Sequence, residues 1–274
     1  MAMRVIWAAV LLTYGVSTGD AMVNQPGPST QSLLPLDKAP NSVDDMYDGC
    51  NDKMEKVATQ YLQNERNGDS LFKKVWDDAE NKFDKKWKKG LSLGKEQVIA
   101  IYVYTFISGD MYRPFNEAVR TQGPQYTTTF KYHALHFYLT DVIQKLNALR
   151  LSKLVKGEDK CLTVYRRVDE YFSQDVVNKA VRFGSFTSSR YGDYPKEKFG
   201  DKSCFKIVTC MGADVSKHSR FEIEAEVLIP PYEVFKVTKI KRRSEQPGLQ
   251  CEVVYTLKST GPPVSNYNCA LFPK

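Results

Sequence analysis

The chain has 274 residues, of which 42% are hydrophobic, so it can bury the core of one large domain. Its 39 lysines and arginines exceed its 32 aspartates and glutamates, and the resulting net charge of +7 is spread along the sequence. No segment has the pattern of a nucleic-acid-binding module. We therefore expect a globular protein without a nucleic acid as its partner.

The N-terminus has the pattern of a secretory signal peptide over residues 1–19. Arg4 precedes an apolar run over residues 5–16, and small residues at 17–19 suit a cleavage site. The apolar run is too short to span a membrane, although an N-terminal anchor is the alternative interpretation. We expect the segment to be removed on export.

The segment that follows, residues 20–44, is polar and rich in Pro, Ser, Gln and Asn, which indicates a flexible leader before one domain over residues 45–274. The C-terminal residues lack the apolar tail that a GPI anchor requires. We therefore expect a secreted, extracellular protein without a membrane anchor, and nothing in the sequence demands more than a monomer.

Cysteine usage fits an exported protein. The sequence contains six cysteines: Cys50, Cys161, Cys204, Cys210, Cys251 and Cys269. An even number in an exported chain indicates three disulfides, for which sequence alone allows about fifteen pairings. No C-x-x-C spacing occurs and only three histidines are present, so we expect no metal site.

The first half of the domain has helical periodicity from residue 54 to residue 149. One apolar stripe at helical spacing consists of Phe72, Trp76, Ala79, Phe83 and Trp87, and Gly90 would end that helix. The continuous apolar run over residues 98–106 suits a buried helix or a strand, and its neighbours favour a helix. The helical signal continues over residues 110–120. It ends with a core-facing stripe of Leu135, Leu139, Val142, Leu146 and Leu149.

After Gly157, short β-branched and aromatic segments alternate with turn residues. We expect six strands, over residues 162–168, 182–188, 204–209, 225–229, 233–240 and 251–257. The fold class is therefore α+β, with a helical part over residues 45–155 and a mainly antiparallel β part over residues 156–274.

Two glutamates near the expected fourth strand suggest chemistry. In an extended chain Glu224 and Glu226 point to the same face, about 6.5–7 Å apart. A carboxylate close to a sugar stabilises the oxocarbenium character that develops when a nicotinamide–ribose bond breaks. A second carboxylate can orient and deprotonate the incoming nucleophile. By itself an E-x-E pair is more often a solvated acidic pair than a catalytic one.

Five motifs in order make the sequence resemble a known family. They are F-N-E-A-V-R at 115–120, A-L-H-F-Y-L-T at 134–140, T-V-Y-R at 163–166, F-G-S-F-T-S-S at 183–189 and E-A-E-V-L-I-P-P at 224–231. Together they resemble the vertebrate arginine-specific mono-ADP-ribosyltransferases, whose signature is R-S-E-x-E. The resemblance extends from Asp45 to Phe272. It implies a two-sheet β core with the NAD cleft between the sheets.

The resemblance assigns the catalytic roles by position. It implies that Glu226 is the catalytic glutamate, which contacts the nicotinamide ribose and stabilises the sugar cation. Glu224 would engage the acceptor guanidinium, and Ser188 would orient Glu226. No glycine-rich dinucleotide loop is present, so the cosubstrate would not bind in a Rossmann site.

The resemblance also implies how NAD is bound. Arg166 would bind an NAD phosphate, which suits its cationic fork. Tyr165, Phe183 and Phe221 are candidate packing groups near nicotinamide or acceptor. NAD is expected as cosubstrate, NADP stays an alternative, and no permanently bound cofactor is implied. His136 lies in a matching segment, and we interpret it as a helix-packing residue.

The expected activity is transfer of ADP-ribose from NAD to arginine side chains of acceptor proteins, with release of nicotinamide. NAD glycohydrolysis and a secreted binding protein on an inactivated transferase fold are the alternatives. The last is kept open because Arg167 and Arg190 replace a usual glycine and a common serine of the family pattern. Both replacements are expected to put a bulky cation near the cleft.

The resemblance finally implies a disulfide pairing. Two bridges match family positions and the remaining cysteines form a third: Cys50–Cys269, Cys161–Cys210 and Cys204–Cys251.

Overall fold

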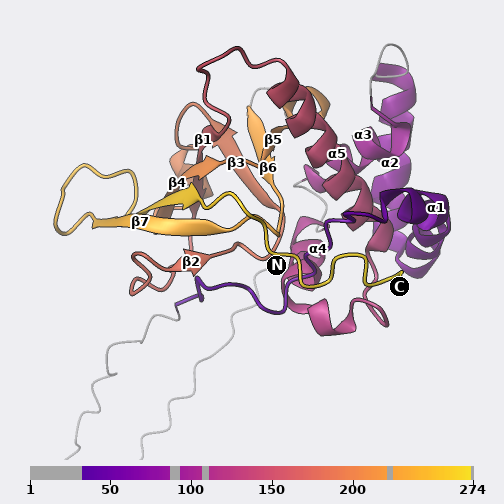
Figure 1. Cartoon of the computed structure of the whole chain (residues 1–274), viewed down its shortest axis with the longest axis horizontal. Helices are drawn as coiled ribbons and strands as arrows, with labels where there is room; N and C mark the ends of the chain where they lie inside the picture. The colour runs from indigo at the N-terminus through magenta and orange to yellow at the C-terminus, as the bar shows by residue number, and fades with distance from the viewer. Residues whose placement is uncertain (1–32, 87–92, 107–110, 221–224, 273–274) are drawn as a thin grey trace, which may run out of the picture. The chain divides into compact units, whose positions relative to one another are not determined.

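Helices occupy the first half of the folded chain (Figure 1). The computed structural model describes residues 33–86, 93–106, 111–220 and 225–272, which belong to one compact unit that starts at Leu33. Its α-helices are α1 (Asn51–Gly68), α2 (Ser70–Lys86), α3 (Lys95–Tyr104), α4 (Tyr112–Thr121) and α5 (His133–Ser152). No helix within these ranges has the length and apolarity needed to span a bilayer.

Apolar periodicity explains the helices. The predicted stripe on α2 is buried, namely Phe72, Trp76, Ala79 and Phe83. Trp87 and Gly90 lie outside the described residues. The continuous apolar run that begins at Val98 forms α3, which is buried along nearly its whole length. The stripe on α5 is buried as far as Val142, and Leu146 is partly buried against the same core. Leu149 is 42% exposed because the end of this helix reaches solvent.

The ordered fold begins earlier than we predicted. Residues 33–44 were expected to belong to a flexible leader, yet Ser42, Val43 and Asp44 are fully buried. The Val43 amide donates to the Val119 carbonyl at 2.7 Å, and Asp44 forms an ion pair with Arg182 at 2.6 Å. The predicted boundary at residue 45 is therefore wrong. The segment is polar in composition, but contacts with residues distant in sequence hold it in the fold.

The second half of the chain forms one eight-stranded sheet. Its strands are β1 (Leu162–Val168), β2 (Ala180–Val181), β3 (Thr187–Tyr191), β4 (Ser203–Thr209), β5 (Ala213–Asp214), β6 (Glu226–Ile229), β7 (Phe235–Arg242) and β8 (Val253–Ser259). Their order is β2-β7-β8-β4-β1-β3-β6-β5, and only β4 and β8 are parallel. The α+β class, with helices first and a mainly antiparallel β part, is confirmed.

The two sheets that we expected are joined at β1. This strand pairs with β4 over seven residues but with β3 over only two, Val164↔Tyr191 and Tyr165↔Arg190. This short ladder joins the strands β2-β7-β8-β4-β1 to the strands β3-β6-β5 in one hydrogen-bonded sheet. Beyond it β1 and β3 have no further paired residues, so the sheet is open there.

The strand predicted over residues 182–188 is wrong in its extent. The chain forms β2 before this segment and β3 at its end, with an irregular stretch between them. Gly184 has a φ of 71°, a left-handed conformation that breaks an extended strand. Arg182 is buried there and donates to the Val264 and Lys38 carbonyls, so its backbone follows these contacts and not a strand ladder.

Two large hydrophobic cores flank the sheet. One lies among the helices and includes Phe186 and Leu228 from the β3–β6 region. The other is formed by Val164, Phe205 and further residues on the opposite face of the strands. The helical core covers the β6 end of one face, where α5 contacts β5. On β4 and β8 a small third cluster buries Cys204 and Val254, packed by Tyr194 and Leu249.

The three predicted disulfides are present: Cys50–Cys269, Cys161–Cys210 and Cys204–Cys251. The second joins the start of β1 to the end of β4. The third joins β4 to the residues just before β8.

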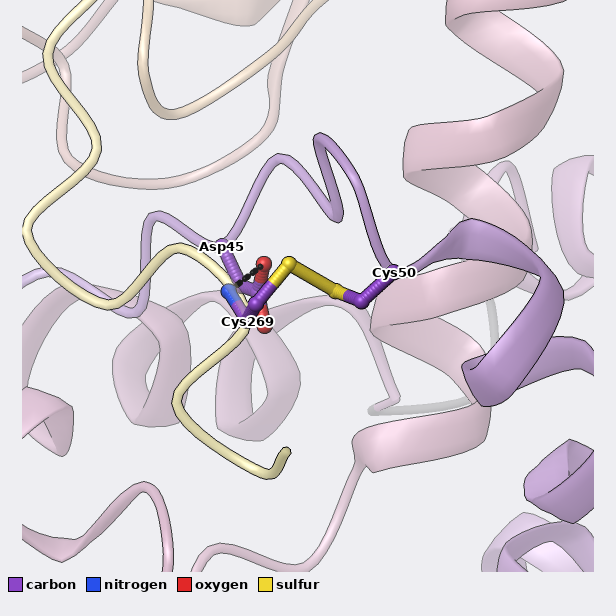
Figure 2. A group of neighbouring side chains, drawn as sticks. All are labelled: Asp45, Cys50 and Cys269. Atoms are coloured by element: carbon purple, nitrogen blue, oxygen red, sulfur yellow. Dashed lines mark hydrogen bonds between the residues drawn. A yellow bond between two sulfur atoms is a disulfide. The ribbon is translucent and has the colours of Figure 1, made fainter. Parts of the chain in front are cut away.

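An acidic residue locks the first bridge in place (Figure 2). Asp45 accepts hydrogen bonds from the Cys269 and Tyr47 amides at 3.0 and 2.7 Å and from the Tyr126 hydroxyl at 2.8 Å. Burial raises the pKa of Asp45 to about 6. Asp45, Cys50 and Cys269 lie within metal-ligand distance of one another, but their two sulfur atoms are bonded to each other and so are not thiolate ligands.

Candidate active site

Glu226 lies at the first position of β6 and is only 7% exposed. One carboxylate oxygen accepts a hydrogen bond from the Ser188 hydroxyl on β3 at 2.5 Å, and the other accepts one from the Ser219 hydroxyl at 3.1 Å. The two serines therefore fix the orientation of the carboxylate. A carboxylate held in this way can stabilise a cation that develops next to it without first reorganising.

Arg166 lies on β1 where the ladder to β3 has ended. Its guanidinium donates to the carbonyl oxygen of Ser188 at 2.7 Å, the residue whose hydroxyl holds Glu226. Burial alone would lower the pKa of Arg166. The hydroxyls of Tyr112 and Tyr104 beside it raise the pKa by more than burial lowers it, so the group stays charged. Ser188 thus links a fixed cation to a fixed carboxylate, because its carbonyl oxygen accepts from Arg166 and its hydroxyl donates to Glu226.

The helices position the start of β3. The Tyr104 hydroxyl on α3 donates to the Phe186 carbonyl at 2.9 Å, and Asn116 on α4 donates to that hydroxyl at 3.2 Å. The Phe186 ring stacks on Phe115 of α4 at 5.7 Å. These contacts fix the backbone two residues before Ser188.

The backbone before Glu226 is not extended. Ala225 has a φ of 47°, and β6 begins only at the next residue. The expectation that Glu224 and Glu226 share one strand face assumed an extended chain through Ala225, and this assumption is wrong. Glu224 and Phe221 lie outside the described residues.

The two predicted aromatic groups lie in different surroundings. Tyr165 is half-buried on β1 and contacts the Tyr194 ring edge-on at 4.7 Å. Phe183 packs at 5.7 Å against each of Phe205 and Phe235 in the second core. A recess of about 590 Å³ lies beside Tyr165. It is lined by Arg150, Leu154, Glu158, Asp159, Cys161, Leu162, Thr163, Tyr165, Tyr191 and Gly192, and does not include Arg166, Ser188 or Glu226.

The two departures from the family pattern differ. Arg167 is buried away from Glu226, where it donates to the Pro195 and Gln250 carbonyls, so the expectation that it lies near the cleft is wrong. Arg190 is paired with Glu226 across β3 and β6 and is half-buried. Its Nε atom is buried without a hydrogen-bond partner among the described residues.

Sequence reasoning did not find Ser219, Tyr104 or Tyr112. Ser219 belongs to a turn after a 3-10 helix (Ser216–His218), and the tyrosines belong to helices that were interpreted as core. Polar hydroxyls on buried helical faces were the only signal for the tyrosines. His136 is fully buried, with Nδ1 2.9 Å from the Tyr47 hydroxyl and Nε2 2.9 Å from the Val43 carbonyl, as a packing residue should be.

Comparison with known proteins identifies this arrangement. A family model described as NAD:arginine ADP-ribosyltransferase matches residues 36–254. The chain is 37% identical to human ecto-ADP-ribosyltransferase 5 over 246 residues, which cover 87% of this chain and 81% of the relative. It is 32% identical to the chicken erythroblast NAD(P)(+)–arginine ADP-ribosyltransferase over 273 residues, which cover 97% and 85% of the two chains.

Solved structures agree with the sequence comparison. The crystal structure of the eucaryotic mono-ADP-ribosyltransferase ART2.2 superposes with a TM-score of 0.69 at 31% identity and covers 88% of this chain and 100% of that chain. A mutant of the same enzyme in complex with NADH gives a TM-score of 0.68 at 31% identity, with the same coverage of both chains. The fold is that of an ADP-ribosyltransferase. The chain belongs to the NAD:arginine ADP-ribosyltransferase family.

Proposed function

We propose that this protein transfers ADP-ribose from NAD to arginine side chains of acceptor proteins and releases nicotinamide. The observation that supports this most directly is the Glu226 carboxylate, which two serine hydroxyls hold beside the opening between β1 and β3. Cleavage of the nicotinamide–ribose bond leaves positive charge on the sugar, and a preoriented carboxylate lowers the energy of that transition state.

The cation at the same opening supports NAD as the cosubstrate. Arg166 can form charge-assisted hydrogen bonds to a phosphate, and its contact with Ser188 couples phosphate binding to the position of Glu226. Ser188 is thus a positioning residue. Tyr165 lies next along β1 and remains a candidate packing group for the cosubstrate, while a cofactor role for Phe183 stays a prediction because its ring packs in the core.

The second carboxylate would serve the acceptor. A guanidinium is protonated in solution and is a poor nucleophile until a carboxylate holds it and accepts its proton. We assign this task to Glu224 on the basis of the E-A-E pattern at residues 224–226. Water needs no such help, so NAD hydrolysis by the same site is the alternative reaction.

Labelled NAD with agmatine as a simple guanidino acceptor tests the proposal. Label on agmatine supports transfer, and free ADP-ribose alone would assign NAD glycohydrolysis. If neither product formed, the result would indicate a binding protein on an inactive transferase fold. The hypothesis of an inactive binding protein depended on two bulky cations, Arg167 and Arg190, near the cleft. Only Arg190 is paired with Glu226, whereas Arg167 bonds to the Pro195 carbonyl.

We propose that the protein acts outside the cell as a secreted protein. Three disulfides suit an oxidising compartment, and residues 1–19 have the pattern of a signal peptide. Expression of the full sequence in cultured animal cells tests this. Enzyme in the medium, resistant to a phospholipase that releases GPI anchors and lacking residues 1–19 by N-terminal sequencing, is the expected result. Enzyme retained on the cell surface would contradict it.

A further inference from the structure

One face of the sheet carries four exposed lysines, Lys206 on β4, Lys236 and Lys239 on β7, and Lys258 on β8. Lys206 pairs with Thr256 of β8, which pairs in turn with Lys239, and Lys258 pairs with Lys236. Residues paired across neighbouring strands point to the same face of a sheet. These four lysines, which we call the basic face, therefore project from one side.

The strand register does not allow the four lysines to point into the core. The alternate residues of the same strands, such as Phe205, Val237 and Leu257, are buried in the second hydrophobic core. A shift by one residue would expose that core. The ion pairs formed in the described part of the chain use other lysines: Lys73, Lys95, Lys145, Lys179 and Lys202. No ion pair within the described ranges involves the four lysines of the basic face, so they are available to an anionic partner.

The basic face continues to the active site. Lys206 pairs with Tyr165, Tyr165 pairs with Arg190, and Arg190 pairs with Glu226. At about 4.8 Å per strand, Lys206 stands on the order of 15 Å from Glu226, and Lys239 roughly 24 Å. The recess of about 590 Å³ beside Tyr165 and Thr163 borders this row. Its lining includes Glu158 and Asp159, so we expect an acidic chain to follow the lysines and not to enter the recess.

We propose that the basic face binds an acidic stretch of the acceptor polypeptide while an arginine of that polypeptide occupies the site at Glu226. This inference rests on the proposed function. A partner that lies on the row from Lys239 to Glu226 must carry both negative charge and the modified arginine, and an acidic polypeptide meets both conditions. An extended chain advances about 3.3 Å per residue, so the acids should lie about four to seven residues from the arginine.

Two synthetic peptides test this on the intact protein. Each contains one arginine; the first has glutamates at about four to seven residues from it, and the second has glutamines there. We expect the glutamate peptide to have the lower KM for ADP-ribosylation. The triple variant Lys206→Glu, Lys239→Glu, Lys258→Glu should raise that KM roughly tenfold. Its KM for the glutamine peptide and for agmatine should not change.

The matched control is Lys53→Glu, Lys56→Glu, Lys74→Glu, which changes the net charge equally at exposed positions of α1 and α2. It should leave all three KM values near those of the wild type. About 0.5 M NaCl should abolish the preference for the glutamate peptide, because exposed charges are screened at that ionic strength. Fluorescence anisotropy of the labelled peptides, without NAD, reads binding separately from catalysis.

Three results would overturn the inference. They are equal KM values for the two peptides on the wild type, the same loss in the control variant, and a loss of heparin affinity in the triple variant without any change in peptide KM. The last result would assign the basic face to a sulfated glycan. Absence of agmatine transfer by the wild type would instead reject the proposed function, and the anisotropy measurement would still decide whether the basic face prefers the glutamate peptide.

Discussion

Glu226 differs from an ordinary surface glutamate in that each of its oxygens has a fixed donor. Ser188 and Ser219 reach it from β3 and from the turn before β6, so its direction is set by two separate segments. Arg166 is tied to Ser188 through the backbone carbonyl. A substitution of any one of these residues should therefore change the positions of the others.

Replacement of Glu226 by Gln should abolish both transfer and NAD hydrolysis while the protein stays folded. The amide has nearly the same shape but no negative charge for the sugar cation. The loss of such stabilisation costs about 3–4 kcal/mol, or a hundred- to thousandfold in kcat. Rates of agmatine modification and ADP-ribose release, with circular dichroism as the folding control, check this.

A mutant that still cleaved NAD normally would move the catalytic role to another acid. Glu233 is a poor substitute, because it is fully buried and its carboxylate accepts hydrogen bonds from the Thr209 hydroxyl and the Cys210 amide. Burial raises its pKa. Glu222 lies outside the described residues and would be tested next.

Glu224→Gln should separate transfer from hydrolysis. We expect transfer to agmatine to fall by roughly a hundredfold, the lower end of the range for general base catalysis. Release of free ADP-ribose should fall much less, because Glu226 remains to stabilise the sugar cation. Both rates are measured on one preparation. An equal fall in both would mean that Glu224 takes part in NAD cleavage itself.

Arg190→Ala should weaken NAD binding. Arg190 is paired with Glu226 and is half-buried, and its buried Nε atom has no hydrogen-bond partner in the described part of the protein. We expect the terminal N–H groups of its guanidinium to bind an anionic ligand. Loss of one charge-assisted hydrogen bond costs about 1.5–3 kcal/mol, which corresponds to a KM for NAD raised by at least tenfold. Steady-state kinetics with varied NAD checks this. A lower KM, or a higher kcat, would show that Arg190 obstructs the cleft.

At the scale of elements, periodicity predicted the helices and most strands correctly. The strand predicted over residues 162–168 matches β1 residue for residue. Helices α2 and α5 follow from their apolar stripes. The ADP-ribosyltransferase family followed from the motifs. The hydrogen bonds that join Glu226, Ser188 and Arg166 connect three residues from those motifs, and their catalytic roles stay predictions.

The remaining features depend on contacts distant in sequence. The left-handed conformation of Ala225 is not a property of alanine, and the sequence around it reads as a continuous strand. The parallel pairing of β4 with β8 and the inward turn of Arg167 are likewise set by partners about 50–80 residues away, such as Gln250. The packing of residues 33–44 also depends on distant partners, including Val119.

Removal of the Cys161–Cys210 bridge should destabilise the β part. The double variant Cys161→Ala, Cys210→Ala opens a loop with a sequence separation of 49, and the chain-entropy model gives a loss of roughly 3–4 kcal/mol. Urea unfolding measures it. The variant Cys204→Ala, Cys251→Ala is the comparison, with a separation of 47.

The comparison variant should lose more stability than the first. Cys204 and Cys251 are fully buried, and Cys251 also accepts a contact from Arg167, so their removal adds lost packing to a similar entropy term. Unchanged stability of the Cys161–Cys210 variant would refute the role of that bridge.

At the scale of the whole molecule, buried titratable groups should govern the acid sensitivity. Burial lowers the pKa of His136 to about 3 and that of His133 to about 4. As the pH falls below 6.5, each histidine takes up a proton in the unfolded chain before it does so in the folded protein. The folded state therefore loses stability as the pH falls toward the folded pKa values. Glu65 accepts hydrogen bonds from the first amides of α5, and burial raises its pKa to about 8. Its contribution has the opposite sign, since it is present at low pH and is lost as the pH rises toward 8.

The variant His136→Gln should flatten the pH dependence of stability. Wild-type His136 must protonate on unfolding below pH 6.5, so its contribution falls by up to about 1.4 kcal/mol per pH unit as the pH falls toward 3. Between pH 6.5 and pH 4.5 the wild type should lose roughly 2 kcal/mol more than the variant. His133, Asp45 and Glu65 are present in both proteins and cancel. Urea midpoints at the two pH values decide, and equal losses would mean that His136 titrates normally in the folded state.

The Cys50–Cys269 bridge encloses nearly the whole fold in a single covalent ring, with a sequence separation of 219. An extracellular protease that cuts once inside this ring, for example in the exposed turn between β7 and β8, would therefore release no fragment. The two pieces would stay joined through the bridge and held by the Asp45 contacts. A nicked molecule could keep its active site assembled, and the cut would become visible only after reduction.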